Sequence, residues 1–284
     1  MQLIDGKTLS KKVQSSVYAE VERLKTEKNI VPGLAVIIVG DNPASHAYVT
    51  MKEKACKGVG FYSITHKMPN SISQDEITNI ITMMNNNPHI HGILVQLPLP
   101  EHIDTDKLLE VIDPKKDVDG FHPYNVGRMF TKLDSFVACT PLGVMRMFEE
   151  YNIELEGKDI VVVGASNIVG KPMASLLLNA NATVTVTHIY TKNLARHTRE
   201  ADIVIVGVGV PQLIKEDMIK EGAIVIDIGI NRLEDGSLVG DVDKAVAPKC
   251  SYITPVPGGA GPMTIAMLLE NTLKSAKLFG EVNA

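Results

Sequence analysis

A tyrosine and a lysine lie four residues apart in the segment "AYVTMKEK" (47–54), which contains neither proline nor glycine. Residues four apart share one face of a helix, so Tyr48 and Lys52 are expected to lie side by side. Both are side chains that can transfer protons in catalysis. Taken alone, however, a helix lysine is usually an exposed one, so the pair is a hypothesis that its surroundings must support.

Gln96 and Asp119 are two more polar residues whose neighbours in the sequence suggest a role. The run "HGILVQLPLP" is apolar through Val95 and then places Gln96 before two prolines. A glutamine there must be hydrogen-bonded, because an unpaired buried polar group costs about 1–3 kcal/mol, although capping of a nearby loop would also satisfy it. In "PKKDVDGFHP" we expect most charges, Asp113 and Asp117 included, to be solvated, and only Asp119 to face a cleft.

The elements that must position these residues alternate along the whole chain. Predicted strands cover 34–40, 61–68, 91–97, 159–165, 183–188, 202–208, 223–229 and 251–254, and predicted helices include 45–58, 73–86, 170–180 and 192–200. Most of the strands are continuous apolar runs, which is typical of parallel strands buried on both faces. The sequence therefore predicts an α/β fold with parallel sheets.

The length of 284 residues favours two domains. A seam lies between about 135 and 150, where Pro141 opens a helix and Gly157 precedes a new strand. We predict a catalytic domain over 1–140 and a nucleotide-binding domain over 141–261. A final helix over 262–280 has an apolar stripe and is expected to pack back on the first domain.

The second half contains a modified dinucleotide-binding turn. "VVVGASNIVGKPMASLLL" reads as a buried strand, a glycine turn and a helix, which presents helix N-terminal amides to a phosphate. Gly164 serves the turn and Gly170 allows close helix packing. Ser166 stands where the second glycine of the usual pattern would be, so the approach of a pyrophosphate must differ.

The next predicted strand indicates which dinucleotide is bound. NAD sites usually have an acid about 20 residues beyond the glycines, whereas this strand ends in "THIYTKN", with His188, Thr191 and Lys192. This favours the extra phosphate of NADP, unless Lys192 is only a solvated residue. The strands ending in "VGVGVP" and "DIGIN" bring glycines to the same edge, where Ile230 is either a wall for the nicotinamide or part of the core.

Composition excludes several other classes of function. A net charge of −5, from 28 basic and 33 acidic residues, does not indicate nucleic-acid binding. No apolar run approaches the length of a membrane span or a signal peptide, so we expect a cytoplasmic protein. The three cysteines form no CxxC pattern, and the histidines form no HExxH motif, so we expect free thiols and no bound metal.

Tyr48, Lys52, Gln96 and Asp119 are followed by "GASNIVGKPM", "DIGIN" and "TPVPGGAGPMT". With these motifs in this order, the chain resembles the bifunctional methylenetetrahydrofolate dehydrogenase/methenyltetrahydrofolate cyclohydrolase family, over nearly its whole length. The resemblance implies an N-terminal α/β catalytic domain and a Rossmann-type NADP domain that face each other across a cleft. It also implies tetrahydrofolate derivatives as substrates and a homodimer.

The resemblance assigns roles to individual residues. Tyr48 would stack on the folate, Lys52 would be the catalytic lysine held by Gln96, and Asp119 would accept hydrogen bonds from the pterin. Backbone at Pro257, Gly258 and Gly259 would approach folate and nicotinamide. The expected cofactor-binding residues are Gly164, Ala165, Ser166, Ile189, Thr191 and Ile230. Many relatives carry arginine at the position of Ala165, and Ile189 is apolar where a polar residue is expected; Lys171, Lys192 or His188 would compensate.

The implied reaction fits these residue types. Oxidation of 5,10-methylenetetrahydrofolate needs positioning and no protein base, whereas hydrolysis of the methenyl product requires water to lose a proton. A lysine can assist there only when a good fraction of it is neutral, which needs burial or a nearby cation. Two alternatives stay open: a monofunctional NAD-dependent methylenetetrahydrofolate dehydrogenase, and a non-catalytic nucleotide sensor on the same sheet.

Overall fold

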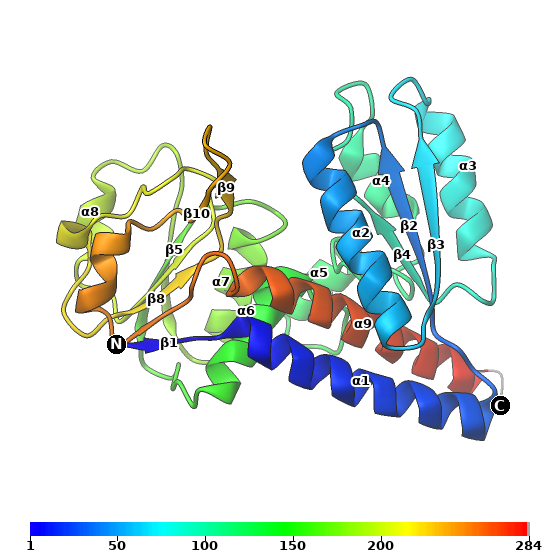
Figure 1. Ribbon diagram of the computed structural model, residues 1–284, viewed down its shortest axis with the longest axis horizontal. Coiled ribbons are helices and arrows are strands. Elements are labelled where there is room, and N and C mark those ends of the chain that lie inside the picture. The colour runs from blue at the N-terminus through cyan, green and yellow to red at the C-terminus, as the bar shows by residue number, and fades with distance from the viewer. Residues whose placement is uncertain (283–284) are drawn as a thin grey trace. The chain divides into compact units, whose positions relative to one another are not determined.

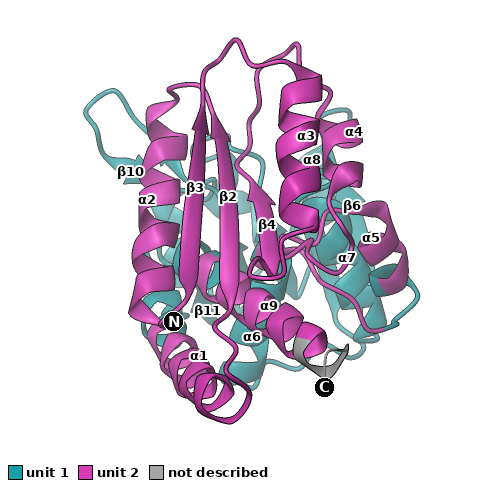
Figure 2. Cartoon of the chain, turned by 90° about the vertical axis from the view of Figure 1, so that its right-hand side faces the viewer, with its two compact units in different colours: residues 1–10, 129–133, 140–264 teal, residues 11–128, 134–139, 265–284 magenta. Residues whose placement is uncertain are grey.

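The computed structural model describes residues 1–282, and these form two compact units, coloured teal and magenta in Figure 2. Unit 1 comprises residues 1–10, 129–133 and 140–264, and unit 2 comprises residues 11–128, 134–139 and the chain from 265 onward. Two long helices, α1 (Gly6–Lys28) and α9 (Ala260–Val282), begin in unit 1 and continue in unit 2. Both units alternate strands and helices, so the predicted α/β class is confirmed.

Unit 2 is built on a parallel sheet of three strands in the order β3 (Tyr62–Met68), β2 (Gly33–Val39) and β4 (Gly92–Val95). Helices α2 (Pro43–Gly58) and α3 (Gln74–Asn85) lie on opposite sides of this sheet (Figure 1). The central strand is buried along its whole length, whereas the edge strand β3 is largely half-buried. The central strand therefore has the continuous apolar sequence that buried parallel strands require.

One face of this sheet carries a hydrophobic core of unit 2. Alternate residues of β2 meet α3 and the short helix α4 (Thr105–Val111) there. The core residues from these elements are Ala35, Ile37, Val39, Ile77, Ile81, Met84 and Leu108. A capping box between Ser73 and Glu76 starts α3, since each side chain hydrogen-bonds the backbone N–H of the other residue.

Unit 1 contains a six-stranded sheet in which every neighbouring pair is parallel. Its order is β1 (Gln2–Leu3), β11 (Tyr252–Ile253), β8 (Ile224–Asp227), β7 (Ile203–Val206), β5 (Asp159–Val163) and β6 (Thr183–Thr187). The remaining elements of the unit include α6 (Cys139–Glu150), α7 (Gly170–Asn179), α8 (Leu194–Thr198) and the small hairpin of β9 (Asn231–Arg232) and β10 (Leu238–Val239). The short helix α5 (Pro123–Phe130) ends where the chain passes from unit 2 into unit 1.

All eight predicted strands and the four predicted helices named above are present, with shorter or shifted ends. The strand predicted over 159–165 ends at Val163 because Gly164 has a φ of +119°, outside the extended region. The two-residue strand β1 has no apolar run of its own, so its pairing with β11 was not predicted. Within residues 1–282, no helix is both long and apolar enough to cross a membrane.

Candidate functional site

Helix α2 turns a lysine toward the interior of unit 2. Asn42 caps the helix by accepting the N–H groups of Ala44 and Ser45. The buried residues of the helix follow a helical period and are Ser45, Val49, Lys52 and Cys56. A lysine therefore occupies a position that would ordinarily be apolar, and it is 8% exposed. The expectation of an exposed helix lysine does not apply here.

Lys52 is hydrogen-bonded to the glutamine that ends the β4 run. The Lys52 ammonium donates to Gln96 Oε1 over 3.0 Å, and Gln96 Nε2 donates to the carbonyl of Leu97 over 2.8 Å. The backbone N–H of Gln96 continues the sheet by donating to Ile37 O. The prediction that Gln96 is hydrogen-bonded is confirmed, and both ends of its amide are used.

Tyr48 lies one helical turn before Lys52 and is half-buried. Burial raises the pKa of its phenol above the ordinary value of 10.0. The ring therefore stays neutral at physiological pH and offers an aromatic face with one polar end.

Asp119 belongs to the same unit and is electrostatically coupled to Lys52. Burial raises the pKa of the Asp119 carboxyl, while the positive charge of Lys52 and a hydrogen bond with the Cys139 thiol act in the opposite direction. Within residues 1–282, no backbone N–H donates to this carboxylate. Asp119 therefore keeps acceptor positions that a ligand with N–H donors can use.

Two of the neighbouring charges, Asp117 and Lys116, are buried, which corrects the prediction of solvation for them. Asp117 is 1% exposed, and its carboxylate accepts from the backbone of Gly120, Phe121 and His122 and from Asn125 Nδ2. It organises the loop that follows Asp119 by satisfying those donors. Charged loop residues were assumed to be exposed, and this assumption fails where the chain folds around the carboxylate.

Lys116 is the second buried charge in this loop and is 2% exposed. Its ammonium donates to three carbonyl oxygens, those of Met84, Asn85 and Asn87, at the end of α3. A lysine at a helix C-terminus satisfies carbonyls that have no partner within the helix. Lys116 is therefore a structural cap, and it was wrongly expected to be solvated.

Asn271, on α9, was not predicted as a site residue. Its Nδ2 donates to Val118 O over 2.8 Å and to Val137 O over 3.0 Å, which joins the segments that precede Asp119 and Cys139. The residue is buried. A polar side chain next to the apolar stripe of the last helix was the available signal in the sequence.

In unit 1, the turn between β5 and α7 brings backbone segments into close contact. A Cβ at Gly170 would lie 2.0 Å from Gly164 O, so glycine is required there. The prediction of tight packing at Gly170 is confirmed. The hydroxyl of Ser166 accepts the N–H groups of Val169 and Gly170 at 3.2 and 3.4 Å, so this serine already binds backbone donors where α7 begins. Ala165 is half-buried beside it.

The loop after β6 is a compact turn that exposes an apolar tip. Thr191 Oγ1 accepts the N–H of His188, and His188 Nδ1 accepts the N–H of Tyr190. Ile189 is 91% exposed at the tip, and Lys192 is exposed beside the turn. No carboxylate stands between His188 and Asn193, so the loop offers only neutral and basic groups near a ribose phosphate. This donor set fits NADP.

The remaining predicted residues of unit 1 lie in two loops. Ile230 is 40% exposed, and its Cδ1 would lie 3.3 Å from a Cβ at Gly261, near the start of α9. In the loop between β11 and α9, Pro257 is exposed, Gly258 O accepts the N–H of Lys7, and Gly259 is buried. Pro257, Gly258 and Gly259 thus belong to unit 1, whereas Tyr48, Lys52, Gln96 and Asp119 belong to unit 2.

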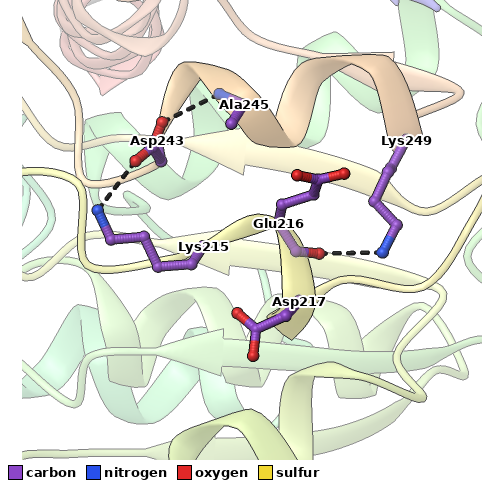
Figure 3. Close-up of a pocket in the computed structure, with 6 residues that line it drawn as sticks. All are labelled: Lys215, Glu216, Asp217, Asp243, Ala245 and Lys249. Atoms are coloured by element: carbon purple, nitrogen blue, oxygen red, sulfur yellow. Dashed lines mark hydrogen bonds and ion pairs between the residues drawn. The ribbon is translucent and has the colours of Figure 1, made fainter.

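A surface pocket of unit 1 offers a contrasting arrangement (Figure 3). Lys215 Nζ pairs with Asp243, and Lys249 Nζ donates to the carbonyl of Glu216. Both lysines thus have hydrogen-bond acceptors within the pocket, and none of the predicted site residues lines it. In the described part of the chain, no group of three or more His, Cys, Asp or Glu side chains could hold a metal ion.

A Rossmann-like parallel sheet with a glycine turn, together with a second α/β unit that buries a hydrogen-bonded lysine, is the organisation of a dinucleotide-dependent enzyme. Models of the tetrahydrofolate dehydrogenase/cyclohydrolase catalytic domain and NAD(P)-binding domain match residues 4–119 and 138–279. The chain belongs to this family.

Similar proteins support the assignment over the full length. The chain is 80% identical over 278 residues to the "Bifunctional protein FolD" of Sulfurovum sp. (strain NBC37-1), covering 98% of this chain and 99% of that protein. A structure of the bifunctional enzyme FolD from Campylobacter jejuni is 56% identical, with a TM-score of 0.96 and coverage of 98% and 99%. The Trypanosoma brucei enzyme, solved with NADP cofactor and inhibitor, is 39% identical, with a TM-score of 0.94 and coverage of 99% and 98%.

Proposed function

We propose that this chain oxidises 5,10-methylenetetrahydrofolate to 5,10-methenyltetrahydrofolate with NADP and then hydrolyses the product to 10-formyltetrahydrofolate. The observation that carries the proposal is the hydrogen bond of the buried Lys52 to Gln96 within a chain of this family. The monofunctional NAD-dependent alternative is not favoured, because relatives that are 80% and 67% identical to the chain are named as bifunctional and the loop after β6 has no acid.

The oxidation needs orientation more than acid–base chemistry. The reacting carbon lies between two nitrogens whose lone pairs expel a hydride, and bound NADP accepts that hydride. The protein therefore has to hold two reactants in line, which is worth up to about 7–11 kcal/mol. We assign the holding of folate to Tyr48, by stacking, and to Asp119, by accepting hydrogen bonds from pterin N–H groups.

The hydrolysis needs a group that handles a proton. Water that adds to the methenyl carbon must lose a proton before the ring opens, and we assign this step to Lys52. Gln96 fixes the lysine through its Oε1 atom, and Tyr48 supplies apolar cover on the same helical face. Backbone at Pro257, Gly258 and Gly259 is assigned to substrate binding.

NADP is the cofactor of this enzyme. We assign its phosphates and ribose to Gly164, Ala165, Ser166, Ile189 and Thr191, and its nicotinamide to Ile230. Because Ala165 and Ile189 carry no charge, His188, Lys171 and Lys192 are the basic residues assigned to the 2′-phosphate. Lys171 donates to Asn167 Oδ1, whereas Lys192 is exposed and reaches solvent.

We further propose the organisation that the family resemblance implies. Residues 1–140, with the helix over 262–280, would form the folate-binding catalytic domain, and residues 141–261 would form the NADP-binding domain. The enzyme would be a cytoplasmic homodimer without nucleic-acid or membrane partners. Light scattering of the purified protein tests the dimer, and a monomeric mass would remove it.

The decisive assay mixes purified protein with 5,10-methylenetetrahydrofolate and NADP, with NAD in parallel, and follows reduced nicotinamide and methenyltetrahydrofolate separately. We expect reduction with NADP and little methenyl accumulation, and added methenyltetrahydrofolate should be hydrolysed faster than in buffer. Methenyl accumulation would remove the second activity. Binding of NADP without turnover of any folate would support the nucleotide-sensor alternative.

A further inference from the structure

Asp241 is a buried carboxylate of unit 1 that has no place in the assignments above. It is fully buried, and its Oδ2 accepts the backbone N–H groups of Val208 and Gly209 at 2.7 and 2.9 Å. Its Oδ1 accepts from Asn231 Nδ2 at 2.8 Å. The carboxylate therefore joins the loop after β7 to the segment after β8.

A second buried acid holds Asp241 in place. Asp227 ends β8 and accepts the N–H groups of Gly229, Asp241 and Val242, each at 3.0 Å. The approach is close enough to require glycine: a Cβ at Gly240 would lie 1.8 Å from Asp227 Oδ2, and one at Gly229 would lie 2.2 Å from Asp241. The two acids and the two glycines therefore pack closely against one another.

The loop that Asp241 holds lies directly against the dinucleotide turn. A Cβ at Gly164 would lie 2.7 Å from Gly207 O and 3.2 Å from the side chain of Val208. A Cβ at Gly207 would lie 3.4 Å from the side chain of Val169, which precedes α7. The backbone that shapes the turn from β5 into α7 therefore rests on a loop whose amides are fixed by Asp241.

We propose that Asp241, supported by Asp227, is a positioning residue for the dinucleotide site. Asp241 fixes the loop over 207–209 against the turn at Gly164. The inference rests on the proposed NADP-dependent function. A carboxylate suits this task because it offers several acceptor positions, whereas an asparagine would direct an NH2 group at donors. Asp241 touches neither reactant in this role and acts through Val208 and Gly209.

The test compares Asp241→Asn with Asp243→Asn. Asp243 stands two residues further on, and its contacts are the N–H of Ala245 and the ammonium of Lys215 (Figure 3). Three quantities are measured on each purified variant: the Kd for NADP by calorimetry, dehydrogenase kcat/KM, and hydrolysis of added methenyltetrahydrofolate without NADP. Hydrogen exchange of the Val208 and Gly209 amides reports the loop directly.

We expect Asp241→Asn to raise the Kd for NADP at least 10-fold and to speed exchange at Val208 and Gly209. Cyclohydrolase activity should stay within twofold of wild type, and Asp243→Asn should change none of these quantities by more than twofold. An unchanged Kd, or a parallel loss of both activities, would overturn the proposal, because a merely structural role would affect both.

A second variant decides the matter if Asp241→Asn does not fold. Asn231→Ala removes one donor to Asp241 and leaves the two backbone bonds, so we expect a two- to fivefold rise in the Kd for NADP. An unchanged Kd in that variant would overturn the proposal. Wild-type protein assayed alongside reports on the proposed function itself, so failure of that function is seen separately as absent NADP reduction.

Discussion

The two units bury carboxylates for different ends. In unit 1, the carboxylates of Asp227 and Asp241 each accept three N–H donors, five of the six from the backbone. In unit 2, Asp119 accepts no backbone N–H among the described residues and faces the charge of Lys52. A buried acid whose acceptor positions are filled by its own chain holds those segments of the chain together. One with positions left over is suited to a ligand.

The same difference separates two acids only two residues apart in unit 2. Asp117 accepts four donors, three of them backbone N–H groups, and is almost fully buried. Asp119 is half-buried and accepts no backbone N–H among the described residues, although burial raises the pKa of both carboxyls. The hydrogen-bond donors that the chain provides to each carboxylate therefore distinguish Asp117, a structural acid, from Asp119, the acid assigned to the pterin.

The largest expected effect concerns Lys52. Lys52→Met should lower cyclohydrolase kcat by about 100-fold or more, the usual contribution of a positioned proton-transfer group. Dehydrogenase activity should fall less, because hydride expulsion needs no protein base. Lys54→Met is the matched control, since Lys54 lies exposed on the same helix. Steady-state assays of both activities measure this, and full cyclohydrolase activity in Lys52→Met would contradict the assignment.

The acids of unit 2 should separate stability from activity. Asp117→Ala leaves four donors unpaired and should lower the free energy of unfolding by about 3 kcal/mol or more. Asp119→Ala should leave stability nearly unchanged, because it leaves no backbone donor unpaired, yet lower kcat/KM for the folate by about 10- to 100-fold. Chemical denaturation and kinetics on both variants test the contrast. Equal destabilisation by the two would refute it.

Most of the fold can be predicted from the sequence, because a strand that is buried on both faces of its sheet consists of a continuous apolar run. β2 and β7 consist of residues that lie in the core, and both were located to within a few residues. Gln96 was located because a polar residue ends such a run, and Lys52 because it lies on the helical face of Tyr48. These signals come from residues that are close together in the sequence, so they can be recognised without knowledge of tertiary contacts.

The rest depends on partners that are distant along the chain. Lys116 caps carbonyls of α3, and Asp241 is satisfied by the amides of an earlier loop, so nothing beside either residue indicates burial. Asn271 likewise acts on segments that precede it by many residues. Charge alone predicts exposure, but hydrogen bonds to groups that are distant along the chain allow these residues to be buried.

Two buried ionisable groups, His91 in unit 2 and Asp227 in unit 1, should contribute to stability with opposite dependences on pH. Burial, assisted by Lys116 and His89, lowers the pKa of His91 from 6.5 to about 4, and burial raises that of Asp227 from 3.8 to about 6. The contribution of His91 is complete above pH 6.5 and is lost as the pH falls toward 4. That of Asp227 is complete below 3.8 and is lost as the pH rises through 6. Each amounts to about 3 kcal/mol.

Hydrogen exchange separates the two contributions, because the amides of β2 report unit 2 and those of β7 report unit 1. Between pH 4 and 6, after correction for intrinsic rates, protection should fall with pH in β7. In unit 2, Asp117 and Asp119 titrate in the same sense as Asp227, because burial raises their pKa. The contribution of His91 is therefore the difference in β2 protection between wild type and His91→Asn, and this difference should rise with pH. His91→Asn is the control, since its side-chain oxygen can replace Nδ1 as acceptor for Gly33 N–H without titrating. A difference between wild type and His91→Asn that does not rise with pH would contradict the prediction for His91, and constant protection of β7 would contradict that for Asp227.

The smallest expected effect tests whether the helix that carries Asn271 sets the position of Asp119. Asn271→Leu removes the bonds to Val118 O and Val137 O and should cost about 1–3 kcal/mol of stability. Thr272→Val is a matched control, since Thr272 is equally buried but donates only to Leu268 O within its own helix. Both variants should be less stable than wild type. Only Asn271→Leu should raise the KM for the folate, by about two- to fivefold, because only it loosens the backbone that carries Asp119. If both variants raised the KM for the folate alike, general loosening of α9 would explain the result. The contrast between acids whose acceptor positions are filled and acids left open to a ligand would then not extend to the residues that support them.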